Sequence, residues 1–151
     1  MSLLQVLVID DSAADLMLMA AAFETCPNVD LILHDHAPTA LRWVEDQVHS
    51  DSLPHLVLLD LHMPGMDGLA WLQAVQLQPA LHQLPVLLYS LAALDLRHGQ
   101  ANLTTICGCW QKPLTFAEMQ LQAEHLCRIW DREHIFTPTT LGVAPPAISV
   151  V

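Results

Sequence analysis

The chain has 151 residues, the length of one domain that can bury a full hydrophobic core. Five Lys and Arg stand against sixteen Asp and Glu, and the net charge of −11 excludes the basic surfaces by which proteins bind nucleic acids or anionic lipids. The apolar runs are too short to span a bilayer, and acidic residues interrupt the N-terminal region where a signal peptide would be apolar, so we expect a cytoplasmic protein without nucleic-acid or membrane partners.

The first half of the chain alternates between predicted strands and helices. Apolar runs at Leu4–Ile9 and Val29–Leu33 predict two strands. Between them, Ser12 is a candidate N-cap of a helix that Pro27 ends, because proline cannot continue the hydrogen-bond ladder. Two apolar stripes at helical spacing belong to this half: Leu16, Met19, Ala20 and Phe23, and then Ala40, Leu41, Val44 and Val48.

The second half continues the alternation. Apolar runs predict three more strands, at Leu56–Leu59, Val86–Tyr89 and Thr105–Trp110. Asp67 is a candidate cap of a third helix, and a weaker fourth helix is expected at Ala93–Ala101, where Gly99 costs about 1 kcal/mol relative to alanine. Thr115 and Glu118 form a capping-box pattern that opens the last helix. The stripe of that helix comprises Met119, Ala123, Leu126 and Trp130.

The order of these elements predicts the fold class. Strict alternation of strand and helix is typical of a parallel sheet with right-handed crossovers and helices on both faces. We therefore expect an α/β fold in which a five-stranded parallel sheet is the middle layer of a flavodoxin-like three-layer sandwich. This domain is expected over residues 1–130, with a C-terminal extension over residues 131–151.

Polar residues stand at the carboxyl ends of four predicted strands. Asp10 and Asp11 follow the first strand, and Asp60 follows the third. Ser90 follows the fourth strand and Lys112 the fifth. Each residue alone has an ordinary explanation, such as a helix cap or a surface cation. However, the carboxyl ends of parallel strands meet at one edge of the sheet, so the five groups are expected to converge on one crevice.

This constellation makes the chain resemble the receiver domains of two-component response regulators over about residues 4–130. The resemblance implies that a sensor histidine kinase transfers a phosphoryl group to Asp60 and that Ser90 is the switch hydroxyl. It implies that Lys112 neutralises phosphoryl charge and that Lys112–Pro113 is a cis peptide, as is usual in the family. The protein would then be a stand-alone phosphoacceptor that signals by a conformational switch or phosphorelay, and not an enzyme with a separate substrate.

The resemblance also implies a Mg²⁺ site. Asp11, Asp60 and the backbone carbonyl of His62 are the implied ligands, and Asp10 acts largely through water. Electrostatics supports this independently, because two carboxylates about 4 Å apart repel by roughly 4 kcal/mol at an effective dielectric near 20. Three clustered acids therefore need a cation to remain ionised, and Mg²⁺ prefers oxygen ligands.

Two positions depart from the family pattern. Cys109 stands where the family usually has the aromatic partner of the switch hydroxyl, and strand alternation turns Trp110 to the opposite face. Leu91 replaces the small residue that usually follows the switch hydroxyl. A competing interpretation is therefore a non-phosphorylated pseudo-receiver that acts as a protein-interaction scaffold. Retention of all the converging polar groups argues against that interpretation.

The C-terminal extension holds more apolar residues than a solvated tail usually does, among them Ile135, Phe136, Leu141 and Val143. Two interpretations stay open: the extension packs on its own domain, or it is an arm that holds a second subunit in a homodimer. The face of the expected fourth helix is another candidate dimer surface. The segment Ile9–Asp15 is similar to the opening of single-domain regulators that pair with bacterial phytochrome kinases, so a phytochrome-type kinase is a candidate partner.

The four cysteines fall within predicted elements, which indicates reduced thiols in the core and not a disulfide framework. Cys107 and Cys109 are two residues apart on a predicted strand, so their side chains are expected on one face of the sheet. This pair lacks the two-residue spacer of a zinc knuckle, and we expect no dedicated transition-metal site.

Overall fold

The computed structural model describes residues 2–90 and 106–141, apart from the side chain of Ser90, and contains the predicted five-stranded parallel sheet. The strand order is β2-β1-β3-β4-β5, and every pairing is parallel. The strands lie within one residue of their predicted ends: β1 (Leu4–Ile9), β2 (Val29–His34), β3 (Leu56–Asp60), β4 (Val86–Ser90) and β5 (Ile106–Gln111).

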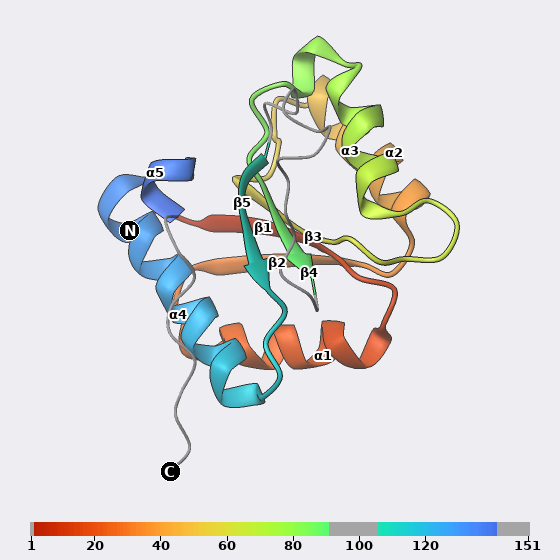
Figure 1. The fold of residues 1–151 in the computed structure, drawn as a ribbon. Helices are drawn as coiled ribbons and strands as arrows, with labels where there is room; N and C mark the ends of the chain where they lie inside the picture. The colour runs from red at the N-terminus through yellow and green to blue at the C-terminus, as the bar shows by residue number, and fades with distance from the viewer. Residues whose placement is uncertain (1, 91–105, 142–151) are drawn as a thin grey trace.

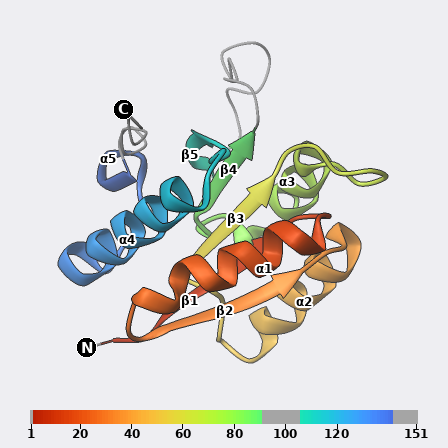
Figure 2. The same cartoon turned by 90° about the horizontal axis from the view of Figure 1, so that it is seen from below.

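Helices cover both faces of this sheet, which confirms the three-layer prediction (Figures 1 and 2). Helices α1 (Ala13–Ala22) and α4 (Phe116–Glu133) lie on one face, and α2 (Ala37–His49) and α3 (Gly68–Gln76) lie on the other. None of the described helices is long and apolar enough to cross a membrane. The helix expected at Ala93–Ala101 lies outside the described residues. The described residues also form three shorter elements: η1 (Phe23–Thr25), η2 (Pro79–Leu81) and α5 (Pro138–Leu141).

Side-chain caps fix where three helices begin, as the sequence predicted. The Ser12 hydroxyl accepts a hydrogen bond from the Asp15 N–H at 3.2 Å, and the Asp67 carboxylate accepts one from the Ala70 N–H at 2.8 Å. Thr115 accepts from the Glu118 N–H at 3.1 Å. The Glu118 carboxylate accepts in return from the N–H of Leu114 and not from that of Thr115, one residue earlier than an ideal capping box. All three caps follow strand ends, so they also fix the loops at the carboxyl edge.

The core is divided by the sheet into two apolar clusters. Each β3 side chain from Leu56 to Leu59 is at most 1% exposed, which fits a central strand buried on both faces. Trp110 belongs to the cluster under α1 and α4, whereas Cys109 packs against the cluster under α2 and α3. The predicted opposite orientation of these two side chains is confirmed.

The expectation that Cys107 and Cys109 share a face is wrong. Cys107 lies in the cluster under α1 and α4, on the opposite side of the sheet from Cys109. The reason is an irregularity in the β4–β5 pairing, where Val86 is opposite Ile106 but Leu87 is opposite Gly108. The extra residue is Cys107, and a bulge of one residue reverses the alternation that sequence spacing assumes.

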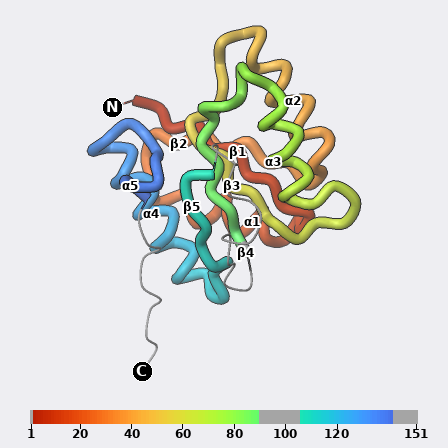
Figure 3. Tube along the Cα trace, turned by 45° about the horizontal axis from the view of Figure 1, so that its top comes forward, coloured from red at the N-terminus to blue at the C-terminus, as the bar shows by residue number. Residues whose placement is uncertain are grey.

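The described part of the C-terminal extension packs on its own domain (Figure 3). Helix α4 continues past residue 130 to Glu133, and Phe136 then stacks on Trp130 with ring centroids 5.8 Å apart. Phe136 is 3% exposed and Leu141 is 1% exposed. Residues 142–151 lie outside the described residues, so an arm to a second subunit and a homodimer stay predictions.

Gly68 at the start of α3 has no room for a side chain. A Cβ added there would lie 2.7 Å from the backbone oxygen of Asp60 and 2.8 Å from the Cα of Leu61. Because both neighbours are backbone atoms, we expect Gly68→Ala to destabilise the fold by about 1–3 kcal/mol, measured by urea unfolding. Gln73→Ala, on the exposed face of α3, is the control and should change stability by less than about 0.5 kcal/mol. Equal stabilities of the two variants would show that the α3 start is free to move.

Candidate functional site

Three carboxylates meet at the carboxyl edge of the sheet. Asp10 follows β1 directly and Asp60 ends β3, and these two strands are hydrogen-bonded neighbours. Asp11 stands next to Asp10 at the start of the loop into α1. One oxygen from each of the three carboxylates lies within 4.8 Å of the others. Asp10 and Asp60 are 6% and 7% exposed, whereas Asp11 is exposed, so the cluster opens to solvent on the Asp11 side.

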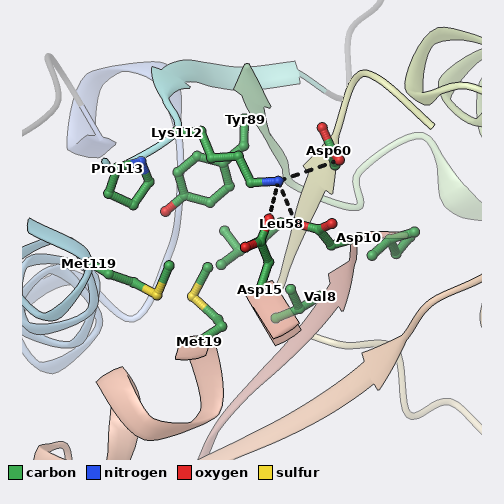
Figure 4. A pocket seen from close by; sticks show the side chains of 11 residues that line it. Val8, Asp10, Asp15, Met19, Leu58, Asp60, Tyr89, Lys112, Pro113 and Met119 are labelled. Carbon is green, nitrogen blue, oxygen red and sulfur yellow. Dashed lines mark ion pairs between the residues drawn. The ribbon is translucent and has the colours of Figure 1, made fainter. Parts of the chain in front are cut away.

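Lys112 provides the positive charge of the site (Figure 4). Its Nζ lies 2.7 Å from Asp10 Oδ2, 2.8 Å from Asp15 Oδ2 and 3.5 Å from Asp60 Oδ2. The described residues contain no cis peptide bond, so the expectation of a cis bond between Lys112 and Pro113 is wrong. The long side chain of Lys112 reaches the acids from a trans peptide.

Backbone groups hold the two buried carboxylates in place. Asp10 Oδ1 accepts a hydrogen bond from the Ser12 N–H at 2.9 Å, and Asp60 Oδ1 accepts one from the His62 N–H at 3.1 Å. In both residues the other oxygen, Oδ2, is the one that faces Lys112. Each carboxylate is therefore held through its Oδ1. The Oδ2 of Asp60 is more weakly held, because the ammonium of Lys112 lies 3.5 Å from it.

The ionisation of the site reflects the clustering of charge. Burial raises the pKa of the Asp60 carboxyl, and the charges of Asp10 and Asp11 act in the same direction. The hydrogen bond from His62 and the charge of Lys112 oppose this rise without cancelling it. Burial alone would lower the pKa of Lys112, but the ion pairs with its acidic neighbours outweigh burial and hold that pKa above its ordinary value. The positive charge near Asp60 is thus too small to offset burial and the neighbouring acids, whereas Lys112 stays fully protonated at neutral pH.

The donor set fits a hard divalent cation. The three clustered residues offer only carboxylate oxygens, which Mg²⁺ and similar ions prefer, and their charges exceed what one ammonium neutralises. One member of the cluster is exposed, which leaves a side where water or a phosphate oxygen can complete the coordination. Asp10, Asp11 and Asp60 are therefore the residues that could hold a metal ion.

Apolar side chains close the opposite side of the site. Met19 from α1, Met119 from α4, and Leu58 and Tyr89 from the sheet line a small cavity next to the acids (Figure 4). Tyr89 is 4% exposed and Leu58 is 1% exposed. The apolar wall excludes water beneath the acids and strengthens every charge interaction above it.

The structure brings together Asp10, Asp11, Asp60 and Lys112, four of the residues that the sequence analysis selected. The backbone of Ser90 ends β4 one residue beyond the pair of Asp60 and Tyr89, but its side chain and Leu91 lie outside the described residues. The side chain of His62 is exposed, its N–H binds Asp60, and the role of its carbonyl stays a prediction.

Asp15 is the site residue that the sequence analysis missed. It lies in the first turn of α1, where an acid is commonly explained by its favourable interaction with the helix dipole. The Ser12 cap turns this first turn toward the carboxyl edge, and Asp15 thereby reaches Lys112. The signal in the sequence was that Asp15 follows the helix cap Ser12 by only three residues, while a lysine was expected at the same edge of the sheet.

We expect Asp60→Asn to stabilise the metal-free protein at pH 7. Because burial raises the pKa of Asp60 in the folded state, its ionised form lowers stability at pH values above that pKa, and the penalty disappears below the ordinary carboxyl pKa of 3.8. The amide removes the charge, so the melting temperature should rise by roughly 2–4 °C for each kcal/mol recovered. The gain should shrink as pH falls toward 4.

Calorimetry with and without Mg²⁺ makes this test specific. Added Mg²⁺ should raise the melting temperature of the parent protein more than that of Asp60→Asn, because the variant has lost a ligand. Asp30→Asn makes the same change in net charge at an exposed position. Its melting temperatures with and without Mg²⁺ should be nearly the same as those of the parent protein. A lower melting temperature for Asp60→Asn than for the parent would contradict the charge argument.

Comparison with known proteins gives a consistent result. The profile of the family described as "Response regulator receiver domain" matches residues 6–124. A protein-glutamate methylesterase/protein-glutamine glutaminase of Geobacter metallireducens is 30% identical over 90 residues, which is 60% of this chain but 23% of that protein. A protein of Methanothrix harundinacea, named "Probable methanogenesis regulatory protein FilR2", is 28% identical over 130 residues, with 83% of this chain and 82% of that protein covered. The chain thus spans about a quarter of the methylesterase and most of the second relative.

Solved structures show the same fold. The phosphorylated cyanobacterial phytochrome response regulator RcpA has a TM-score of 0.72 at 20% identity, covering 85% of this chain and 94% of its own. The Mn²⁺-bound form of the response regulator Rcp1 has a TM-score of 0.69 at 21% identity, covering 83% and 93%. The bacteriophytochrome response regulator AtBRR has a TM-score of 0.65 at 23% identity, covering 97% and 98%. At these identities the likeness concerns the fold alone.

Proposed function

Because the chain belongs to the response regulator receiver domain family, we propose that it is a signalling protein that accepts a phosphoryl group on Asp60 from a sensor histidine kinase. Family membership implies phosphoacceptor signalling in general, and the proposal adds the acceptor residue, the donor and the need for Mg²⁺. The observation that carries it is the cluster of three carboxylates within 4.8 Å of one another, faced by the ammonium of Lys112. A scaffold without phosphorylation has no use for this costly arrangement of charge.

Asp60 is the nucleophile in this proposal. Its Oδ1 is held by the His62 N–H, which leaves Oδ2 to attack phosphorus in line with the phosphorus–nitrogen bond of a phosphohistidine. The new oxygen–phosphorus bond forms as the bond to the histidine breaks, and the imidazole leaves with the electron pair. Asp60 must be ionised for the attack. Positive charge near Asp60 favours the ionised form, and it promotes the reaction as long as it leaves Oδ2 free to attack.

Asp11, Asp60 and the backbone carbonyl of His62 would hold a divalent ion, with Asp10 acting largely through water. The ion would supply positive charge against the phosphoryl oxygens. The chain's own contribution to this neutralisation is Lys112. Its ammonium is 3.5 Å from Asp60 and closer to its other two acidic partners. A small shift of this side chain would bring it to a phosphoryl group on Asp60. Ser90, one residue beyond the register partner of Asp60, then acts as the switch hydroxyl that binds a phosphoryl oxygen.

We also propose that the donor is a kinase of the phytochrome type. The support for this finer assignment is the fold likeness to RcpA and AtBRR, both of which are described as phytochrome response regulators. The methylesterase relatives support the receiver assignment alone, because their alignments cover less than a quarter of their length.

The acceptor residue can be tested by intact-mass measurement of the full chain after incubation with acetyl phosphate and Mg²⁺. We expect an adduct with the mass of one phosphoryl group. The adduct should not form when EDTA removes the Mg²⁺, nor in Asp60→Asn. Asp67→Asn is the matched control in the same loop, because asparagine also serves as a helix N-cap, and this variant should still be labelled. A natively folded parent that never gains the adduct from either acetyl phosphate or a phosphorylated kinase would favour the scaffold interpretation.

Asp15 should slow phosphorylation by holding Lys112 away from the reacting oxygen. Asp15→Asn removes a half-exposed ion pair of up to about 1 kcal/mol, so the rate of labelling by acetyl phosphate is expected to rise roughly three- to fivefold. The Asp30→Asn variant, with the same net charge, controls for weaker long-range repulsion of the anionic donor. A slower rate in Asp15→Asn would instead mean that Asp15 positions Lys112 for the reaction.

A further inference from the structure

Two cysteines that the acidic site does not use line the same surface cavity, between the end of η1 and the second half of helix α4. Cys26 caps the end of η1 just before β2, and Cys127 lies in the second half of α4. Both side chains pack against the same core cluster, and both line one surface cavity together with Glu124, Arg128 and Asp131. Cys26 is close enough to raise the pKa of the Cys127 thiol, and both residues are free thiols.

We propose that Cys26 and Cys127 form a redox-sensitive pair that a low-molecular-weight disulfide, such as glutathione disulfide, converts into an intramolecular disulfide. Disulfide formation requires two side chains that already approach each other in the folded protein. The fold brings the two thiols to the wall of one cavity and against the same core cluster, although the residues are distant in sequence. Partial exposure of both residues at the cavity gives a small reagent access to them.

The cavity favours one order of events. Burial, the neighbouring Cys26 and the charges of Asp131 and Glu124 raise the pKa of Cys127, so Cys127 stays a protonated thiol at neutral pH. We assign the first attack to Cys26, which leaves a mixed disulfide that peptide mapping can detect.

The exchange balances as two displacements. The Cys26 sulfur forms a bond to one sulfur of the reagent, the reagent's disulfide breaks, and the first released thiol carries the proton that Cys26 has lost. The Cys127 sulfur then loses its proton and attacks the Cys26 sulfur of the mixed disulfide, and the second released thiol takes that proton. The two protein thiols are oxidised by two electrons in total, and the reagent is reduced to two thiols.

The disulfide would join the segment before β2 to helix α4. The first turns of α4 contribute Met119 to the wall of the acidic site, so the link would tie one support of that site to the opposite end of α1. It would also close a loop of about 100 residues, the kind of loop in which a cross-link most restricts the unfolded chain. Oxidation is therefore expected to raise the melting temperature by roughly 5–10 °C.

The test uses the reduced full chain, equilibrated with glutathione buffers of increasing oxidised fraction and then quenched with acid. Alkylation followed by peptide mapping should show that two of the four thiols are lost and that the peptides containing Cys26 and Cys127 are linked. Calorimetry should show the rise in melting temperature on oxidation. Cys26→Ser and Cys127→Ser should lose both effects, whereas Cys109→Ser, a half-buried thiol on the other face of the sheet, should keep them.

Several results would overturn the proposal. One is a glutathione adduct that persists on Cys26 without the link to Cys127. Another is a link found no more often in the native chain than in the chain oxidised in urea, where the four thiols pair at random. The peptide map of the oxidised parent chain is enough to distinguish these results from the expected one. The test therefore does not depend on the folding of any variant. The result is also independent of whether Asp60 is phosphorylated.

Discussion

The excess of negative charge at the carboxyl edge of the sheet is the constraint on which the site depends. Among the described residues, Asp10, Asp15 and Asp60 surround the single ammonium of Lys112, and Asp11 lies beside Asp10 and Asp60. Such a cluster is costly where burial limits solvation, and two backbone N–H donors and the exposure of Asp11 reduce the cost only in part. The folded chain is therefore strongly sensitive to added charge, whether it comes from a cation or from a phosphoryl group. This sensitivity is what a signalling site requires.

The fold can tolerate this cost because the acids stand at the ends of very stable elements. The β3 residues from Leu56 to Leu59 are almost completely buried, and each such side chain contributes about 1.5–3 kcal/mol relative to exposure. The helix caps at Ser12 and Asp67 and the tight contact at Gly68 fix the loops that follow β1 and β3. The strands thus hold the carboxylates at a spacing that the carboxylates would not adopt by themselves.

The sequence predicted most of the fold and most of the acidic site, because both depend on local patterns. Apolar runs, helix caps and the residues at strand ends can be recognised without knowing what lies opposite them. The failures concern residues whose position depends on a partner distant in sequence. The bulge at Cys107 appears only when β5 is paired with β4, and Asp15 acquires its role only when Lys112 arrives from the fifth strand. In the same way, apolar residues alone could not say whether Phe136 packs on its own domain, because its stacking partner Trp130 lies on α4 and is itself hydrogen-bonded to Ser2 at the other end of the chain.

The described aromatic residues near Ser90 lie on the face of the sheet under α1 and α4. Cys109 occupies the face under α2 and α3, so it offers no ring to a moving hydroxyl on β4. Tyr89 and Trp110 instead meet edge to face under α1 and α4, with ring centroids 6.4 Å apart, and Trp110 also contacts His125 of α4 at 5.8 Å. Tyr89 lies between Leu88 and Ser90 on β4 and lines the acidic site, so a displacement of this strand end would press first on Trp110 and then on α4. If the proposed switch operates, the surface that changes with it is therefore that of α4, on the face of the sheet where the aromatic contacts lie.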